Sequence, residues 1–151
     1  DLLSAESGTP GMIDTIASEE DIAEILRAPF SSVISDATYP GTGLLHPRVT
    51  GMTAELLNRF VRERQDLTLE EAVSRLTLRP AERYGLAGKG RIALGADADL
   101  CLFDPEGFRP VGTYADPRRA AAGMDWVFVG GRPVLREGQR TGERPGGVLR
   151  R

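Results

Sequence analysis

The chain has 151 residues, enough for one sizeable hydrophobic core or for parts of two. Its apolar share of 40% and charged share of 27% are those of an ordinary globular protein. The net charge of −3 argues against nucleic acid or an anionic membrane surface as the main partner. No apolar run approaches the roughly 20 residues that a membrane-spanning helix needs, so we predict neither a nucleic-acid nor a membrane partner.

The cysteine content and the first residues indicate the cellular location of the protein and the extent of its gene product. The single cysteine, Cys101, excludes an internal disulfide framework and fits a cytoplasmic location. Residues 1–11 are rich in Ser, Thr, Gly and Pro, which predicts a loop and not a signal peptide. The sequence does not begin with Met, so we expect it to start inside a longer gene product.

Helices are predicted in the first half of the chain. The first begins after Ser18, whose hydroxyl can cap a first turn rich in acids, and it ends at Pro29. The apolar spacing of the first helix indicates that Ile22, Ile25 and Leu26 lie on one face. A second helix presents an apolar face made of Met52, Leu56, Leu57, Phe60 and Val61. The third starts at the capping box Thr68–Glu71, and a short fourth runs over Pro80–Tyr84 and ends at Gly85.

A short apolar run between the first two helices predicts a buried strand over Ser32–Ser35. The strand ends at a carboxylate, Asp36, and a loop rich in Gly and Pro then leads to His46 and Arg48. In α/β enzymes, side chains at the ends of strands commonly carry the chemistry. The spacing alone also allows Asp36 to be a turn-capping residue, because Asp is frequent in turns.

From about residue 86 the pattern changes from helical spacing to short runs separated by glycines. Ala98–Asp104 predicts a strand, with Cys101 as a small core residue in its middle. Trp126–Val129 and Pro133–Arg136 flank Gly130-Gly131 and predict a hairpin. The basic, glycine-rich tail predicts an extended surface arm, and the change of pattern marks a domain boundary.

Four phrases occur in one order: SDA…HPR, LTLEEAVSRLTLRPAERYGL, GKGRIALGADADLCLFDP and WVFVGGRPVLREGQRTGERPGGVLR. Together they resemble the C-terminal part of the amidohydrolase superfamily, and most closely its D-aminoacylase branch, the N-acyl-D-amino-acid deacylases. The helix phrase and the GRIALGADADL phrase are shared across the superfamily and indicate architecture. The Ser35-Asp36 step with His46-Pro47-Arg48 is narrower and indicates the deacylases.

The resemblance implies an α/β fold in two parts. Residues 1–85 would be the end of a (β/α)8 TIM-like barrel, comprising its last strand and closing helices. Residues 86–151 would be the C-terminal strands of a small β-sandwich and a basic tail. Asp36 matches the carboxylate at the end of the last barrel strand, which takes a proton from a metal-bound water and returns it to the leaving nitrogen.

The resemblance also assigns substrate-binding residues. Arg48 matches the arginine that holds the free carboxylate of an N-acyl amino acid, a task that suits a planar guanidinium. A solvent-exposed loop arginine is the alternative interpretation. Tyr39 lies in the same loop and is a further candidate for contact with substrate. His46 is not among the principal metal ligands of the family, so we interpret it as structural.

Zinc is the cofactor that the resemblance implies, but its histidine ligands would lie upstream, because this chain has one histidine. We expect the remainder of the same enzyme, or an N-terminal partner chain, to complete the site. The predicted reaction is amide hydrolysis of a small N-acyl amino acid by metal-activated water. Two alternatives remain: a cyclic amidase of the dihydroorotase or hydantoinase type, and a non-catalytic module that retains the fold.

Overall fold

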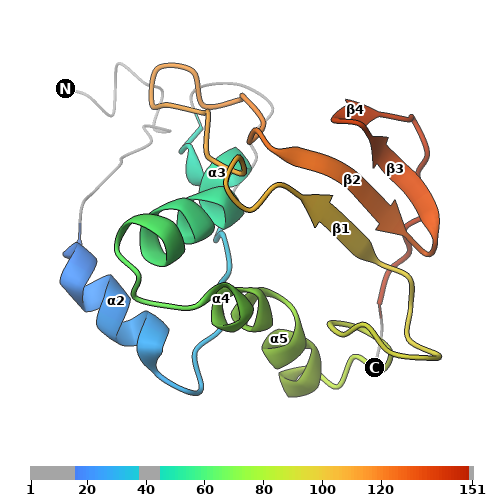
Figure 1. Cartoon of the computed structure of the whole chain (residues 1–151), viewed down its shortest axis with the longest axis horizontal. Helices are drawn as coiled ribbons and strands as arrows, with labels where there is room; N and C mark the ends of the chain where they lie inside the picture. The colour runs from blue at the N-terminus through green and yellow to red at the C-terminus, as the bar shows by residue number, and fades with distance from the viewer. Residues whose placement is uncertain (1–15, 38–44, 150–151) are drawn as a thin grey trace, which may run out of the picture.

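The computed structural model describes residues 16–37 and 45–149, and it places a group of helices beside an antiparallel sheet (Figure 1). The helices are α2 (Glu19–Arg27), α3 (Arg48–Glu55), the π-helical η1 (Leu56–Glu63), α4 (Leu69–Leu76) and α5 (Leu78–Arg83). The strands are β1 (Leu100–Phe103), β2 (Met124–Val129), β3 (Arg132–Arg136) and β4 (Gln139–Arg140). Within the described ranges, no helix is long and apolar enough to cross a bilayer.

Two helices begin at capping boxes, one at the predicted N-cap Ser18 and one at the predicted box of Thr68 and Glu71. The Ser18 hydroxyl accepts a hydrogen bond of 3.1 Å from the Asp21 amide, and the Asp21 carboxylate accepts one of 3.1 Å from the Ser18 amide. At α4 the same exchange joins Thr68 and Glu71 over 3.2 and 2.9 Å. Each box satisfies backbone donors that a helix N-terminus otherwise leaves without partners.

The predicted second helix is confirmed, but it changes its winding halfway along. α3 continues without a break into η1, where the Arg64 amide donates to the Arg59 carbonyl, five residues earlier, over 2.9 Å. The buried residues of η1 are Leu56, Leu57 and Phe60, all on the predicted apolar face. The apolar spacing alone did not reveal the wider turn, in which the backbone bonds span five residues in place of four.

The short helix before the glycine-rich region is also confirmed, although α5 starts at Leu78 and not at Pro80. It ends where predicted, because Gly85 adopts a φ of +65° and its amide bonds to the Glu82 carbonyl over 3.1 Å. Positive φ is costly for residues with a Cβ, and glycine therefore commonly follows the last turn of a helix.

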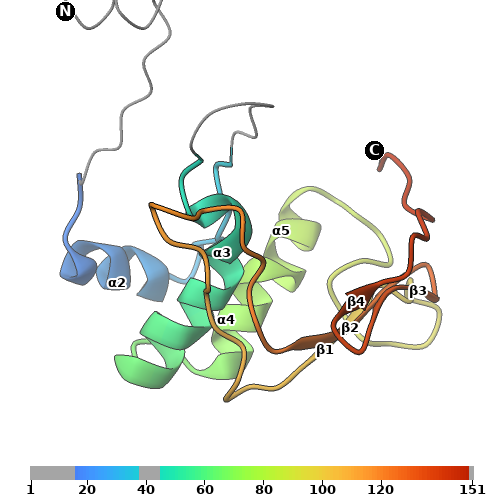
Figure 2. The same cartoon turned by 90° about the horizontal axis from the view of Figure 1, so that it is seen from above.

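The sheet is a four-stranded antiparallel meander in the order β1-β2-β3-β4. Gly130 and Gly131, with φ of +55° and +76°, connect β2 to β3, which confirms the predicted hairpin. The tail from residue 141 to 149 has no regular structure and is mostly exposed, as predicted for a surface arm. Figure 2 shows the tail leaving the sheet on the side away from α2.

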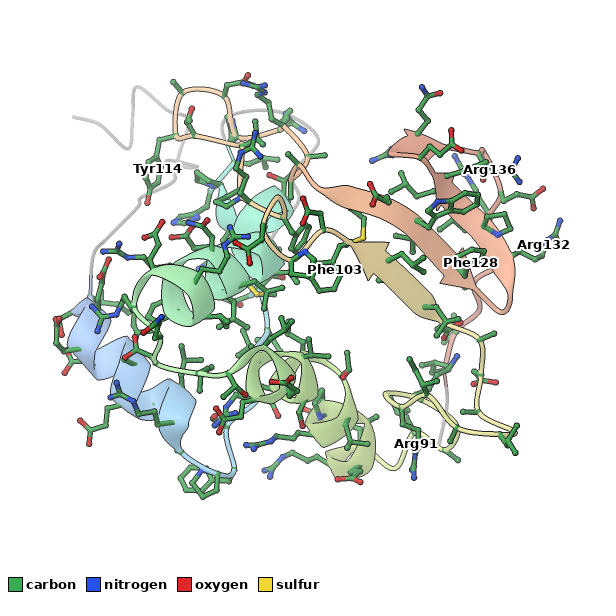
Figure 3. All side chains as sticks on the ribbon, in the orientation of Figure 1. Arg91, Phe103, Tyr114, Phe128, Arg132 and Arg136 are labelled. Carbon is green, nitrogen blue, oxygen red and sulfur yellow. The ribbon has the colours of Figure 1, made fainter. Side chains whose placement is uncertain are left out.

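One hydrophobic core joins the helices to the strand region. Its buried members come mainly from the helices, with Phe108 from the region between β1 and β2. Phe103, at the end of β1 nearest the helices (Figure 3), packs against this core and lies 5.3 Å from Phe108 between ring centroids. The division at residues 85 and 86 matches the change from helix to strand, but it stays a prediction as a domain boundary.

The strand prediction over Ser32–Ser35 is wrong for the described structure, because this segment joins no sheet. Its residues still alternate between less and more exposed, and Ile34 is 76% exposed. The Val33 amide donates to a helix residue, the Arg75 carbonyl, over 3.2 Å. A strand needs a neighbouring strand to supply its ladder of hydrogen bonds, and none of the four strands pairs with this segment.

Two burial predictions are also wrong. Cys101 lies in the middle of β1, as expected, but it is exposed and not a core residue. β1 is an edge strand that pairs only with β2 in the described sheet, so its side chains are covered less than those of a central strand. On α2 the buried residues are Ala23 and Leu26, while Ile25 is 64% exposed.

Candidate active site

Asp36 and Arg48, the two principal candidates from the sequence, lie against one another. The Arg48 Nη2 atom is 3.2 Å from Asp36 Oδ2. The pair is open to solvent, since the side chains of Arg48 and Asp36 are 43% and 81% exposed. The structure therefore brings a carboxylate and a guanidinium together from opposite ends of one loop, at a place where a small molecule can reach both.

The backbone at Asp36 adopts an unusual conformation. Its φ is +46°, in the left-handed region that residues with a Cβ seldom occupy. Asp tolerates this region better than most residues because its short polar side chain can bond locally. Both interpretations from the sequence fit this conformation, because Asp in turns often adopts it and strained backbone also occurs at functional sites.

Arg48 is the first residue of α3, and His46 helps to hold it there. Pro47 precedes the helix and gives no side-chain cap, but the Arg48 amide donates a hydrogen bond of 3.0 Å to His46 Nδ1. An acceptor Nδ1 carries no proton, so this contact fixes the neutral imidazole with its proton on Nε2. His46 thus satisfies one of the free amides at the start of α3.

The surroundings of His46 favour the same neutral form. Burial, followed by the nearby Arg48 guanidinium, lowers the pKa of His46. Its ring meets Tyr114 edge to face, with 5.4 Å between ring centroids and 78° between the planes. Figure 3 shows Tyr114 on the loop that follows the β1 region and returns toward α3. These contacts agree with the structural role that the sequence indicated for His46.

A cavity of about 550 Å³ lies beside this pair, between α2, the α3–η1 helix and the loop near Tyr114. Its walls are mainly apolar, and the ionisable residues that line it are Arg48, His46, Glu55 and Tyr114. Burial raises the pKa of Glu55. Val33 also lines the cavity, but Asp36 does not. Asp36 lies three residues later, in a segment whose residues alternate in exposure.

The remaining candidates are not brought into this site by the described structure. Tyr39 lies outside the described residues. In residues 16–37 and 45–149, no three His, Cys, Asp or Glu side chains group closely enough to hold a metal ion. Cys101 lies on β1, in the sheet region, and is not among the residues that line the cavity.

Arg75 is the residue that sequence reasoning missed. It lies on the apolar side of α4 and is 2% exposed. Burial, followed by the neighbouring Arg79, lowers the pKa of its guanidinium. The sequence did contain a sign of this burial. Arg75 lies one position before Leu76 and three after Ala72, on the helix face that the apolar spacing assigns to the core.

The helix that leads into the candidate site is fixed to η1 by ion pairs. The Arg59 guanidinium binds both carboxylate oxygens of Glu19, at distances down to 2.7 Å, and the pKa of Glu19 is lowered by this contact. Arg64 binds Asp66 over 2.6 Å, and Arg27 of α2 contacts the same carboxylate. The network holds the two ends of α2 against η1, which restricts where the following segment can run.

Comparison with known proteins gives the family. The model of the amidohydrolase family matches residues 6–135. N-acyl-D-glutamate deacylase of Alcaligenes xylosoxydans xylosoxydans is 38% identical over 141 residues, 93% of this chain and 28% of the relative. D-aminoacylase of the same organism is 36% identical over 141 residues, 93% of this chain and 29% of the relative.

A solved structure agrees with these relatives. The crystal structure of N-acyl-D-glutamate deacylase from Bordetella bronchiseptica, complexed with zinc and a phosphonate mimic of the tetrahedral intermediate, matches with a TM-score of 0.82 and 37% identity. The match covers 89% of this chain and 28% of that one, so the chain spans less than a third of the length of these proteins. On these matches, the chain belongs to the amidohydrolase family, and its relatives include the D-aminoacylases.

Proposed function

We propose that this chain contributes the acid–base carboxylate and the substrate-binding arginine to a metal-dependent hydrolase that removes the acyl group from N-acyl-D-amino acids. The observation that carries the proposal is the contact between Asp36 and Arg48, in a chain 36–38% identical to deacylases of this kind. A reactive carboxylate beside a cation for the substrate is the arrangement that such a reaction needs.

In the proposed reaction Asp36 acts twice. Its carboxylate accepts a proton from the water that attacks the amide carbonyl, and the resulting carboxylic acid then protonates the leaving nitrogen. The amide C–N bond breaks, and a carboxylic acid and a free amino acid are released. The high exposure of Asp36 fits this role, because its oxygens are open to a water and a substrate.

Arg48 would bind the α-carboxylate of the same substrate. A guanidinium offers two parallel N–H donors to a carboxylate, and this geometry fixes orientation as well as position. The existing pair with Asp36 does not prevent binding, because an exposed ion pair contributes only about 0–1 kcal/mol. A substrate carboxylate that replaces Asp36 at Arg48 leaves the Asp36 carboxylate free to act as the base.

Zinc is the proposed cofactor, but the described residues do not form a zinc site. A catalytic zinc usually takes three protein ligands, and this chain has one histidine, whose Nδ1 already accepts the Arg48 amide. We therefore place the ligands in a preceding part of the same enzyme or in a partner chain. That part would also supply the other strands of a (β/α)8 barrel beside Ser31–Asp36, and the rest of a β-sandwich beside β1–β4. A cytoplasmic location stays a prediction.

The test is an activity assay on the complete open reading frame that contains these 151 residues, purified and supplied with zinc. N-acetyl-D-amino acids should be hydrolysed, with the N-acetyl-L enantiomers as the matched control. Hydrolysis of a dihydroorotate-type or hydantoin-type ring in place of the linear amides would reassign the protein to the cyclic amidases. No hydrolysis of either class would support a non-catalytic module and overturn the proposal.

A further inference from the structure

Arg75 is a buried cation whose partners are mostly backbone carbonyls. Its Nε donates to the Leu26 carbonyl over 2.6 Å, Nη1 to the Glu71 carbonyl over 3.2 Å and Nη2 to the Arg27 carbonyl over 3.4 Å. Among the described residues no carboxylate forms an ion pair with it. Leu26 and Arg27 are the last residues of α2, where free carbonyls carry the partial negative charge of the helix end.

A buried charge of this kind is costly for stability alone. Removing an ion from water is expensive, and apolar residues of similar volume often replace buried ions without loss of stability. The contacts of Arg75 indicate what the charge provides. The Arg75 side chain joins α4 to the end of α2. In the contact with Arg27, the two residues are 48 positions apart in the chain.

Arg75 also holds the segment that leads to Asp36, through both its side chain and its backbone. Its Nε lies 3.2 Å from the Ser31 hydroxyl, and its own carbonyl accepts the Val33 amide over 3.2 Å. Val33 is three residues before Asp36. Within the described residues this segment pairs with none of the strands β1–β4, and its bonds to Arg75 link the approach to Asp36 directly to α4.

We propose that Arg75 is a positioning residue for Asp36, an inference that rests on the proposed role of Asp36 in the reaction. Asp36 itself is exposed and in a left-handed conformation, so packing of its own side chain does not fix its place. Within the described residues its position therefore depends on the backbone before it, which Arg75 holds together with the bonds of Ser31 to Leu26 and Ala28. Arg48 lies beyond this control, because its amide is fixed by His46.

The test compares Arg75→Met and Arg75→Lys with a matched control, Arg79→Met, in the complete protein. Arg79 also donates to a backbone carbonyl just after α2, that of Pro29, but no bond joins it to Ser31 or Val33 in the described structure. For Arg75→Met, kcat per folded enzyme should fall by about 10–100-fold, since a displacement near 1 Å at a reacting group can cost about 10²-fold. KM should change less than about threefold, Arg75→Lys should recover part of kcat, and Arg79→Met should match the parent.

Two further measurements separate this inference from other failures. Ser31→Ala leaves the buried guanidinium in place but removes its contact with the segment, together with the hydroxyl's own bonds to the Leu26 and Ala28 carbonyls. It should lower kcat by about 2–10-fold even if Arg75→Met does not fold. Hydrogen exchange at the amides of residues 33–36 should become faster in Arg75→Lys and Ser31→Ala, and not in Arg79→Met. Exchange and kcat both unchanged in an active enzyme would overturn the inference. If the parent has no deacylase activity, the proposed function fails, and the exchange measurement alone then decides whether Arg75 holds the segment.

Discussion

Arg48→Lys is the substitution that tests substrate recognition most directly. The change keeps the charge but replaces a planar pair of donors by a single ammonium group. Among the described residues, Arg48 Nη2 forms its ion pair with an exposed carboxylate, that of Asp36, at 3.2 Å. The substitution should therefore alter the fold little and act mainly on the bound substrate.

The expected magnitude follows from these contacts. Loss of a hydrogen bond to a charged group costs about 1.5–3 kcal/mol, which corresponds to a fall in kcat/KM of about 10–100-fold. Loss of the Asp36–Arg48 ion pair changes this figure little, because exposed ion pairs contribute about 0–1 kcal/mol. The assay measures kcat/KM for an N-acetyl-D-amino acid and for the same compound with its carboxylate converted to an amide.

The parent enzyme should strongly prefer the acid over the amide, and Arg48→Lys should have lost most of that preference. Arg119→Lys is the matched control, since Arg119 is also exposed and lies 3.9 Å from a carboxylate, that of Asp116. It should behave as the parent does. If parent and Arg48→Lys show the same preference for the acid, Arg48 does not bind the substrate carboxylate, and the loop is structural.

Four other outcomes are expected. Asp36→Asn should lower kcat by about 10²–10⁴-fold with normal folding and metal content, and activity within about threefold of the parent would contradict its role. The 151-residue chain alone should be inactive, and elemental analysis should find no stoichiometric zinc in it. The hydrogen bond from Lys89, and then that from a backbone amide, lowers the pKa of Asp99. The stability that Asp99 adds is therefore present at neutral pH and lost on acidification. The difference in unfolding free energy between parent and Asp99→Asn, from urea titrations, should shrink as the pH falls below about 4. Gly90→Ala should destabilise by about 1–3 kcal/mol more than Gly95→Ala in the same titrations, because both glycines have positive φ but only the new Cβ at residue 90 would meet backbone, at 2.7 Å.

The features that the sequence predicted well are those determined by near neighbours in the chain. Ser18 and Thr68 each cap a helix through a residue three positions later, so four consecutive residues contain the whole signal. The Gly130-Gly131 turn is equally local, since its positive φ values favour glycine whatever lies around it. Helix boundaries and the hairpin could therefore be derived without knowledge of the fold.

Features that depend on distant residues were missed or wrong. The buried position of Arg75 depends on carbonyls 48 and 49 residues away, and no local pattern encodes them. Whether residues 32–35 form a strand depends on a neighbour, and alternation of exposure alone does not supply one. For the site, both members of the Asp36–Arg48 pair could be predicted from the sequence, but their contact is seen only in the structure.

In the described structure Asp36 and Arg48 are exposed, and the residues that support them lie beside their backbones. Functional side chains need supporting residues that are themselves fixed by packing and hydrogen bonds. Asp36 and Arg48 are accordingly held through their backbones, from opposite ends of the loop. On one side Arg75 binds the segment before Asp36, and on the other the His46 ring accepts the Arg48 amide. Arg75 is buried, which is rare for an arginine, and His46 is half-buried. Changes at these two positions should thus disturb catalysis and binding separately, since each controls one member of the pair.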